Sequence, residues 1–113
     1  MQRRFRLRRS ADFEHLRRVG RTHQHRLIVM SVSPNNLQDN RYGFIVSKGL
    51  GKAVVRNRTR RLLREATRLL HPHLHPGHDV VIIARRPIVG QPFVVIQRTV
   101  NELFRRASLI KEG

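Results

Sequence analysis

Residues 53–70 constrain the fold more than any other part of the chain. At helical spacing they divide into an apolar side and a cationic side. The apolar side carries Val55, Thr59, Leu62, Leu63, Ala66, Leu69 and Leu70. The cationic side carries Arg56, Arg60, Arg61, Arg64 and Arg68, with Asn57 among them and Arg58 at the border. This pattern predicts an amphipathic helix that packs against a core and presents arginines to the outside.

The arginine side of this segment does not stabilise a helix by itself. Like charges four residues apart weaken a helix by roughly 0.2–0.5 kcal/mol per pair. Glu65 is the one acidic residue in the segment, whereas an ordinary solvated helix face usually mixes both signs. Phosphate groups would supply the missing negative charge, so the pattern favours RNA or DNA binding over a merely solvated face.

The composition of the whole chain also favours a polyanionic partner. The sequence has 24 Lys and Arg residues against 7 Asp and Glu residues, a formal net charge of +17. Nucleic acid is the obvious polyanion, and an anionic membrane surface is the competitor. Only three of the basic residues are lysine. Arginine binds phosphate with two parallel hydrogen bonds and stacks on bases, although codon usage explains a preference for arginine equally well.

Length and residue content exclude several classes of protein. The 113 residues predict a single domain over 1–113, with residues 1–9 as a basic arm. The absence of cysteine excludes disulfides, thiol chemistry and cysteine-based zinc sites. The start of the chain has no apolar signal segment, and apolar runs such as 80–84 are too short to span a bilayer. We therefore expect a cytoplasmic protein with no membrane partner.

The remaining patterns predict an α+β fold, a two-layer sandwich of one sheet and its helices. In chain order we expect a helix from Ser10 to Gly20, a strand over 25–33 that could extend back to Arg21, a strand over 41–47, a loop over 71–78, a strand over 79–84 and a helix that begins at Pro92. The short polar link between the strands at 25–33 and 41–47 predicts an antiparallel hairpin. The continuous apolar run at 79–84 predicts a central strand.

Two features next to the cationic face are candidate binding elements. Asn57 can contact a base edge, a 2′-hydroxyl or a hydrated metal ion, or it can simply bond to its own backbone. The glycine-containing loop from Lys48 to Lys52 precedes a helix N-terminus, where backbone N–H groups favour phosphate. A flexible connection is the alternative for this loop, which lacks the full Walker pattern.

Aromatic residues give a second set of candidates. Phe5 and Phe13 are flanked by arginines and could stack on unpaired bases. Core packing is the competing explanation for Phe13, and without other knowledge it is favoured. Tyr42 and Phe44 alternate onto one face of a strand, where they could form either a base platform or part of the core.

The acidic and histidine residues do not assemble into a catalytic or metal site. Two-metal hydrolysis needs clustered carboxylates, and the seven here are scattered. The loop at 71–78 contains His71, His73, His75 and His78, but its loose spacing favours a solvated loop over a metal site. We therefore expect no catalytic residue and no protein-held metal, and we expect any chemical step to be performed by a partner.

The chain resembles the bacterial ribonuclease P protein component. The stretch Ser47-Lys48 followed by residues 51–66 (GKAVVRNRTRRLLREA) resembles the RNR motif of that family. Residues 6–9 with Asp12-Phe13 resemble its N-terminal segment, and residues 42–47 resemble its central strand. Residues 79–85 resemble the strand after the motif helix, and residues 103–106 resemble the end of the last helix. The resemblance covers essentially the whole chain.

The resemblance implies an α-β-β-β-α-β-α order, with a mixed sheet of about four strands. It implies a rare left-handed βαβ crossover that carries the RNR helix, against the usual right-handed rule. It also implies a catalytic RNA partner that holds Mg²⁺, no organic cofactor and no obligate protein partner. The RNA-docking residues would be Lys48, Lys52, Arg56, Asn57, Arg58, Arg60, Arg61, Arg64 and Arg68. A separate cleft for the 5′ leader of precursor tRNA would use Phe13, Arg17, Arg6, Arg8 and Arg9.

The sequence departs from the family pattern at two places in that cleft. Many relatives carry a second aromatic one turn after Phe13, where this chain has Arg17. They often have an aromatic in the first long strand, where this chain has Met30-Ser31. The leader cleft would then depend more on cations and less on stacking.

The resulting hypothesis is a protein subunit of a ribonucleoprotein that removes the 5′ leader from precursor tRNA by endonucleolytic cleavage. The runner-up is a small ribosomal or ribosome-assembly protein without a leader cleft. A protein nuclease that uses histidines of the 71–78 loop is a third possibility.

Overall fold

A computed structural model describes residues 2–7 and 10–112. Three helices and four strands follow the α-β-β-β-α-β-α order implied by the resemblance. They are α1 (Ser10–Val19), β1 (Arg21–Gln24), β2 (Ile28–Pro34), β3 (Arg41–Ile45), α2 (Ala53–Leu70), β4 (His78–Ala84) and α3 (Phe93–Arg106). The predicted helices are confirmed, including the bounds of α2 and the end of α1 at Gly20, whose N–H bonds to the carbonyl of Leu16.

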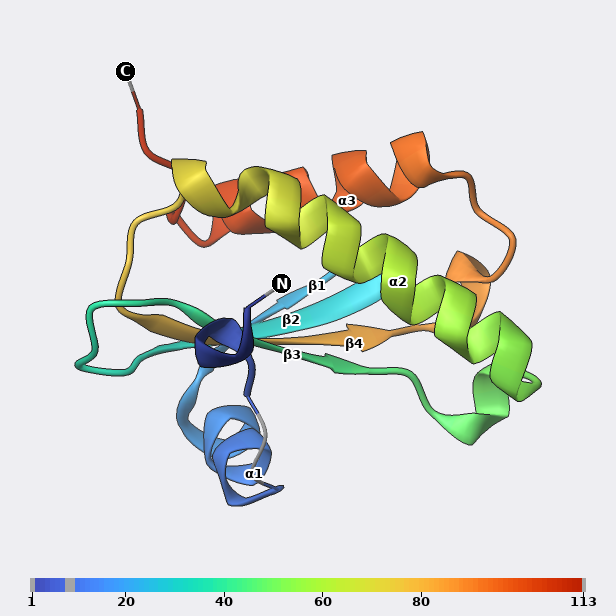
Figure 1. The fold of residues 1–113 in the computed structure, drawn as a ribbon, viewed down its shortest axis with the longest axis horizontal. Coiled ribbons are helices and arrows are strands. Elements are labelled where there is room, and N and C mark those ends of the chain that lie inside the picture. The colour runs from blue at the N-terminus through green and yellow to red at the C-terminus, as the bar shows by residue number, and fades with distance from the viewer. Residues whose placement is uncertain (1, 8–9, 113) are drawn as a thin grey trace.

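The four strands form one mixed sheet in the order β1-β2-β4-β3. β4 is antiparallel to β2 and parallel to β3, which confirms the prediction of a central strand at 79–84. Helix α1 covers one face of the sheet, and α2 and α3 cover the other (Figure 1). Because β3 and β4 run in the same direction, α2 must cross from one end of the sheet to the other. This crossover is left-handed, as the resemblance implied (Figure 1).

The predicted hairpin between residues 25–33 and 41–47 is wrong. Residues 21–34 form two strands, β1 and β2, which pair with each other, and β4 lies between β2 and β3. The β1–β2 turn is closed locally, since the Leu27 N–H donates to His25 Nδ1 at 3.0 Å. A strand that is apolar on both faces is typically central in its sheet, with a partner strand on each side. β4 is such a strand, and it takes this position between β2 and β3, so β2 and β3 cannot pair directly.

The larger core lies between the sheet and the two helices α2 and α3. Its fully buried members include Tyr42, Leu63, Ile82, Val100 and Phe104. A smaller cluster of Leu7, Leu16 and Val81 lies on the α1 side of the sheet, with Phe13, Ile45 and Ile83 packed against it. On α2 the buried positions are Thr59, Leu63, Ala66 and Thr67. Leu69, predicted on the apolar side, is 42% exposed, whereas Thr67 is fully buried, so the buried face of α2 is centred nearer Thr67 than the sequence pattern predicted.

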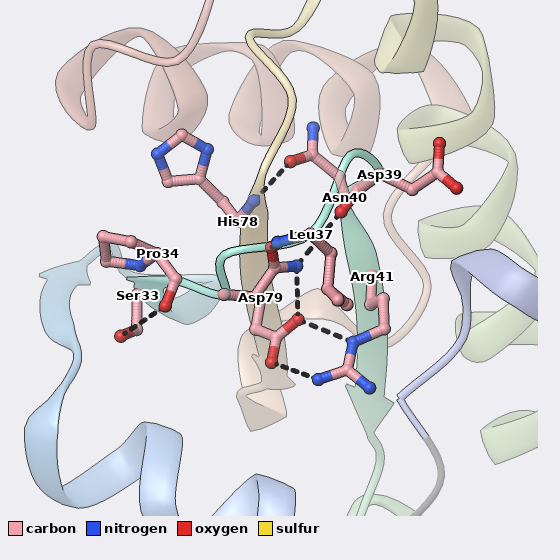
Figure 2. Close-up of polar contacts among 9 residues, drawn as sticks. Ser33, Pro34, Leu37, Asp39, Asn40, Arg41, His78 and Asp79 are labelled. Carbon is pink, nitrogen blue, oxygen red and sulfur yellow. Dashed lines mark hydrogen bonds and ion pairs between the residues drawn. The ribbon is translucent and has the colours of Figure 1, made fainter.

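A polar cluster holds the β2–β3 loop onto the start of β4 (Figure 2). The Arg41 guanidinium donates two hydrogen bonds to the Asp79 carboxylate, from Nε at 2.9 Å and from Nη2 at 2.7 Å. Asn35 Nδ2 donates to the same carboxylate at 2.9 Å. Hydrogen bonding to Asp79 raises the pKa of Arg41. Asn40 adds a bond to the carbonyl of His75 at 3.0 Å, so the loop, both strands and the segment before β4 are tied together.

We predict that Asp79→Ala destabilises the domain by roughly 1–3 kcal/mol. It leaves the half-buried Arg41 guanidinium without its acceptor and removes one of the two acceptors of Asn35 Nδ2. Urea denaturation would measure the change in the free energy of unfolding. Glu65→Ala is the control, since it removes an ion pair that is exposed to solvent and should leave the midpoint nearly unchanged. Equal midpoints for the two variants would contradict the structural role of Asp79.

Candidate nucleic-acid interface

The exposed side of α2 carries cations that lack acidic partners. Within the described residues, ion pairs join Arg41 to Asp79, Arg68 to Glu65, and both Arg106 and His25 to Glu102. None of these pairs involves the five remaining arginines of the helix, which are Arg56, Arg58, Arg60, Arg61 and Arg64. The helix therefore keeps its charge available for an external anion, as the sequence pattern predicted.

Arg68 differs from the other predicted docking residues. Its guanidinium forms two hydrogen bonds with the Glu65 carboxylate, at 2.9 Å and 2.6 Å. This pairing raises the pKa of Arg68 and lowers that of Glu65. The charge of Arg68 is thus already balanced within the protein, so it has less to gain from a phosphate than its neighbours.

The Asn57 side chain bonds to a neighbouring side chain, whereas one alternative from the sequence was a bond to its own backbone. Its Oδ1 accepts a hydrogen bond from Arg60 Nη1 at 3.0 Å, and the side chain is exposed. Arg56 is also oriented locally, since its Nε donates to the carbonyl of Gly51 at 3.1 Å. These contacts hold the side chains of the motif in place on the helix surface.

The loop before α2 is an ordered turn. Lys48–Leu50 form a single 3₁₀ turn, and Gly51 has a φ of 135°, which glycine adopts without strain. Lys52 is the N-cap residue of α2 and makes no side-chain capping bond. The first N–H groups of the helix therefore have no side-chain acceptor, and both lysines are exposed beside them.

The flank of α2 that carries Arg60 and Arg64 overhangs the edge strand β3 and meets the N-terminal arm. The two arginines line a cleft of about 140 Å³ that also contains Phe13 of α1. Its full lining is Arg6, Leu7, Phe13, Tyr42, Gly43, Phe44, Arg60 and Arg64. The cationic helix and the cleft were predicted as separate sites, yet the structure joins them at this point.

The electrostatics of this cleft favour an anion. Burial lowers the pKa of Arg64, and the charges of Arg6 and Arg60 lower it further. Three guanidinium groups thus converge here, and no carboxylate of the described residues is paired with any of them. A phosphate placed among them would relieve their mutual repulsion.

Phe13 packs against the sheet and also lines the cleft. Its ring packs on Gly43 so closely that a Cβ at that position would lie 2.3 Å from its Cε1 atom. The ring also contacts the small core cluster of Leu7, Leu16 and Val81. It nevertheless remains half-buried and lines the cleft. A glycine within a strand marks a close approach of this kind, and this signal could have identified Gly43 as part of the site.

Two other aromatic candidates, Tyr42 and Phe5, pack against other side chains of the protein. Tyr42 is 1% exposed and belongs to the larger core, so it is not a base platform. Phe5 packs on His71 with ring centroids 4.5 Å apart. Ser31 lies on the α1 side of the sheet and bonds through its hydroxyl to Thr22 at 3.2 Å, in the strand where the family pattern often has an aromatic.

Arg17 is exposed on α1 but does not line the cleft. Arg8 and Arg9 lie outside the described residues.

In the described part of the chain, no three histidine or acidic side chains gather as a metal site would require. None of the helices described is both long enough and apolar enough to cross a membrane.

A small α+β domain that joins a cationic helix to an arginine- and phenylalanine-lined cleft has the architecture of a nucleic-acid-binding protein. The family model for ribonuclease P matches residues 1–108. The ribonuclease P protein component of Roseiflexus castenholzii is 44% identical over 112 residues, which cover 98% of this chain and 92% of that protein. The component from Caldanaerobacter subterraneus is 42% identical, with 94% of this chain and 91% of that protein covered.

Solved structures agree with the sequence relatives. The ribonuclease P protein of Staphylococcus aureus matches with a TM-score of 0.87 at 29% identity, covering 95% of this chain and 98% of that one. The protein from Thermotoga maritima matches with a TM-score of 0.83 at 28% identity, covering 96% and 98%. The chain belongs to the ribonuclease P protein family.

We predict that Gly43→Ala displaces the Phe13 ring, because the new methyl group would overlap it. Overpacking of this kind costs roughly 1–3 kcal/mol of unfolding free energy. Gly49→Ala is the matched control, since its Cβ would have only Ser47 Oγ nearby, at 3.8 Å. Thermal or urea denaturation would compare the two, and similar stabilities would contradict the close packing of Phe13 on β3.

Proposed function

We propose that this protein is the RNA-binding subunit of ribonuclease P and acts in the removal of the 5′ leader from precursor tRNA. The observation that carries the proposal is the unpaired cationic face of α2, which continues into the cleft at Phe13 in a chain that matches the family over nearly its full length. The reaction is an endonucleolytic hydrolysis that leaves a 5′-phosphate on the tRNA.

The partner RNA performs the chemical step in this proposal. Two-metal hydrolysis by a protein uses clustered carboxylates, and the described residues contain no group of three or more histidine and acidic side chains that could hold a metal ion. Mg²⁺ is then held mainly by the RNA. The contribution of the protein is to neutralise phosphates, which lowers the repulsion between two RNA molecules that must approach each other.

The two parts of the surface have different tasks in the complex. The residues that dock on the catalytic RNA lie in the first half of α2 and in the turn before it. They are Lys48, Lys52, Arg56, Asn57, Arg58 and Arg61, with Arg68 as a minor contributor. The cleft with Phe13 and Arg6 takes the single-stranded leader, with the aromatic ring against a base and the guanidinium against a phosphate. Arg60 and Arg64 lie where the two surfaces meet. Contact with the leader favours precursor over mature tRNA.

The alternatives have less support. A ribosomal or ribosome-assembly protein would need no leader cleft, and the family match over residues 1–108 does not favour it. A protein nuclease based on the 71–78 loop would need histidines that converge. Instead, His71 bonds to Tyr42 and packs against Phe5.

The proposed function is tested by cleavage of precursor tRNA with a cognate catalytic RNA at low Mg²⁺. We expect the protein to stimulate cleavage strongly, because it supplies charge neutralisation that Mg²⁺ otherwise provides. The protein alone should not cleave. A lack of stimulation, or cleavage by the protein alone that is lost on His→Ala changes in the 71–78 loop, would refute the proposal.

We predict that Arg60→Ala and Arg64→Ala each weaken RNA binding and make its salt dependence shallower. The slope of log K against log salt should decrease by roughly 0.7–0.9 for each lost phosphate contact. Arg68→Ala is the matched control, because Glu65 already balances that charge, and it should change the slope much less. Filter binding at several salt concentrations would measure this, and three equal slopes would show that position on the helix does not matter.

A further inference from the structure

The described part of the N-terminal arm, residues 2–7, reaches the free edge of the sheet at Arg6 and Leu7. Arg6 pairs with Tyr42 of β3 as a parallel bridge, and the Leu7 N–H donates to the Tyr42 carbonyl at 2.8 Å. The arm thus extends the sheet beyond β3 by a very short segment. Two residues of backbone pairing are too few to hold a segment that carries this much positive charge, so side-chain contacts must contribute.

An aromatic contact supplies that anchor. The Phe5 ring lies against the His71 ring, with centroids 4.5 Å apart and a tilt of 52°. The guanidinium carbon of Arg4 lies 4.6 Å from the Phe5 centroid, within cation–π range. The arm is therefore attached to the point where α2 ends, since His71 is the C-cap residue of that helix.

The His71 ring is held in turn by a hydrogen bond to Tyr42. The Tyr42 hydroxyl and His71 Nδ1 share a hydrogen bond of 2.6 Å. Tyr42 is buried in the larger core and packs edge-on against Phe104 of α3, with centroids 6.4 Å apart. Burial raises the pKa of Tyr42 to about 12, so its hydroxyl stays protonated and can donate to a neutral imidazole. The contacts Phe5–His71–Tyr42–Phe104 form a continuous path from the arm to the core.

Arg6 follows Phe5 directly in the chain, so the contact of Phe5 with His71 also affects where Arg6 lies. With Phe5 held on His71 and Leu7 held on β3, Arg6 lines the cleft beside Arg60 and Arg64. Without the anchor, the arm could leave the edge strand and take Arg6 with it. Among the histidines of the 71–78 segment, His71 is the one whose ring makes these contacts with the arm.

We propose that His71 is a positioning residue that, through Phe5, locks the N-terminal arm on the edge of β3 and so places Arg6 in the leader cleft. The inference rests on the proposed function for the identity of the ligand, which is the phosphodiester backbone of the leader. In this proposal His71, one of the histidines at 71–78, supports RNA recognition and does not bind a metal.

The state of the His71 ring makes this lock sensitive to acid. Burial lowers the pKa of His71 below its ordinary value of 6.5, and the nearby charges of Arg4 and Lys111 act in the same direction, while Asp39 opposes them. The docked arm thus favours the neutral ring. The lock is complete above pH 6.5 and weakens as the pH falls through the lower value, where the Nδ1 acceptor for Tyr42 is lost.

Hydrogen exchange tests the docking directly. In Phe5→Ala and His71→Ala we expect the Leu7 amide to exchange at least several-fold faster than in the unmodified protein. His73→Ala is the matched control, because it removes a neighbouring exposed ring that has no contact with Phe5 among the described contacts. His71→Phe keeps an aromatic surface for Phe5 and should recover part of the protection. Unchanged exchange in Phe5→Ala and His71→Ala would overturn the proposal.

Binding to the reconstituted ribonucleoprotein tests the consequence. Phe5→Ala should weaken the affinity for leader-bearing precursor tRNA by roughly 10-fold, the size of one charge-assisted contact. The affinity for a leaderless tRNA and for the catalytic RNA should be unchanged. In an Arg6→Ala background the same change should have little further effect, because both variants remove one contact. Additive losses, or equal losses with and without a leader, would overturn the role of the lock.

The two proposals fail in distinguishable ways. If the unmodified complex does not prefer leader-bearing precursor, the proposed function is wrong. Fast exchange at Leu7 in the variants would still support the lock in that case, and slow exchange would refute it.

Discussion

The central strand β4 is the constraint on which the rest of this structure depends. Its apolar side chains, among them Val80, Val81 and Ile82, are fully buried, so it needs a partner strand on each side and a helical layer on each face. Antiparallel pairing with β2 and parallel pairing with β3 satisfy the backbone. The parallel pair in turn requires a crossover long enough to return along the sheet, and α2 is that crossover. The cationic helix is therefore held across the sheet beside the edge strand.

The position of α2 explains why the cationic face and the cleft are continuous. One flank of the helix packs on the core through Leu63 and Ala66, and the other overhangs β3 through Arg60 and Arg64. Because β3 is an edge strand, the N-terminal arm can pair with it, and α1 can place Phe13 against Gly43 from the opposite face. The cleft thus contains residues from four separate segments. It exists only because the edge of the sheet is where these segments meet.

The few acidic residues are distributed in a way that suits this arrangement. Asp79 and Glu102 pair with cations outside α2, where they fix a loop and the last helix. On α2, Glu65 is taken by Arg68 at the far end of the helix. The segment around Arg56 to Arg64 is left without compensation in the folded protein. Its repulsion lowers the stability of the free protein, and it becomes favourable once phosphates occupy the surface.

The sequence by itself determined the local elements and the chemistry of the main surface. The 3.6-residue period of residues 53–70 was strong enough to give both bounds of α2, and the apolar run at 79–84 indicated a central strand. The unpaired charge of Arg56, Arg58 and Arg61 followed from composition and spacing alone. These features depend on neighbours along the chain, so a one-dimensional pattern contains them.

The tertiary structure decided what depended on distant partners. Strand pairing was predicted wrongly, because a short link between 25–33 and 41–47 says nothing about a third strand that enters between them. The burial of Thr67 in place of Leu69 depended on which face of α2 packs on the core. The cleft brings Arg64 together with Arg6 and Phe13, and Phe5 contacts His71; in each case the partners lie roughly 50 or more positions apart in the chain. Such contacts are set by sheet order and packing, and only the folded chain brings them together.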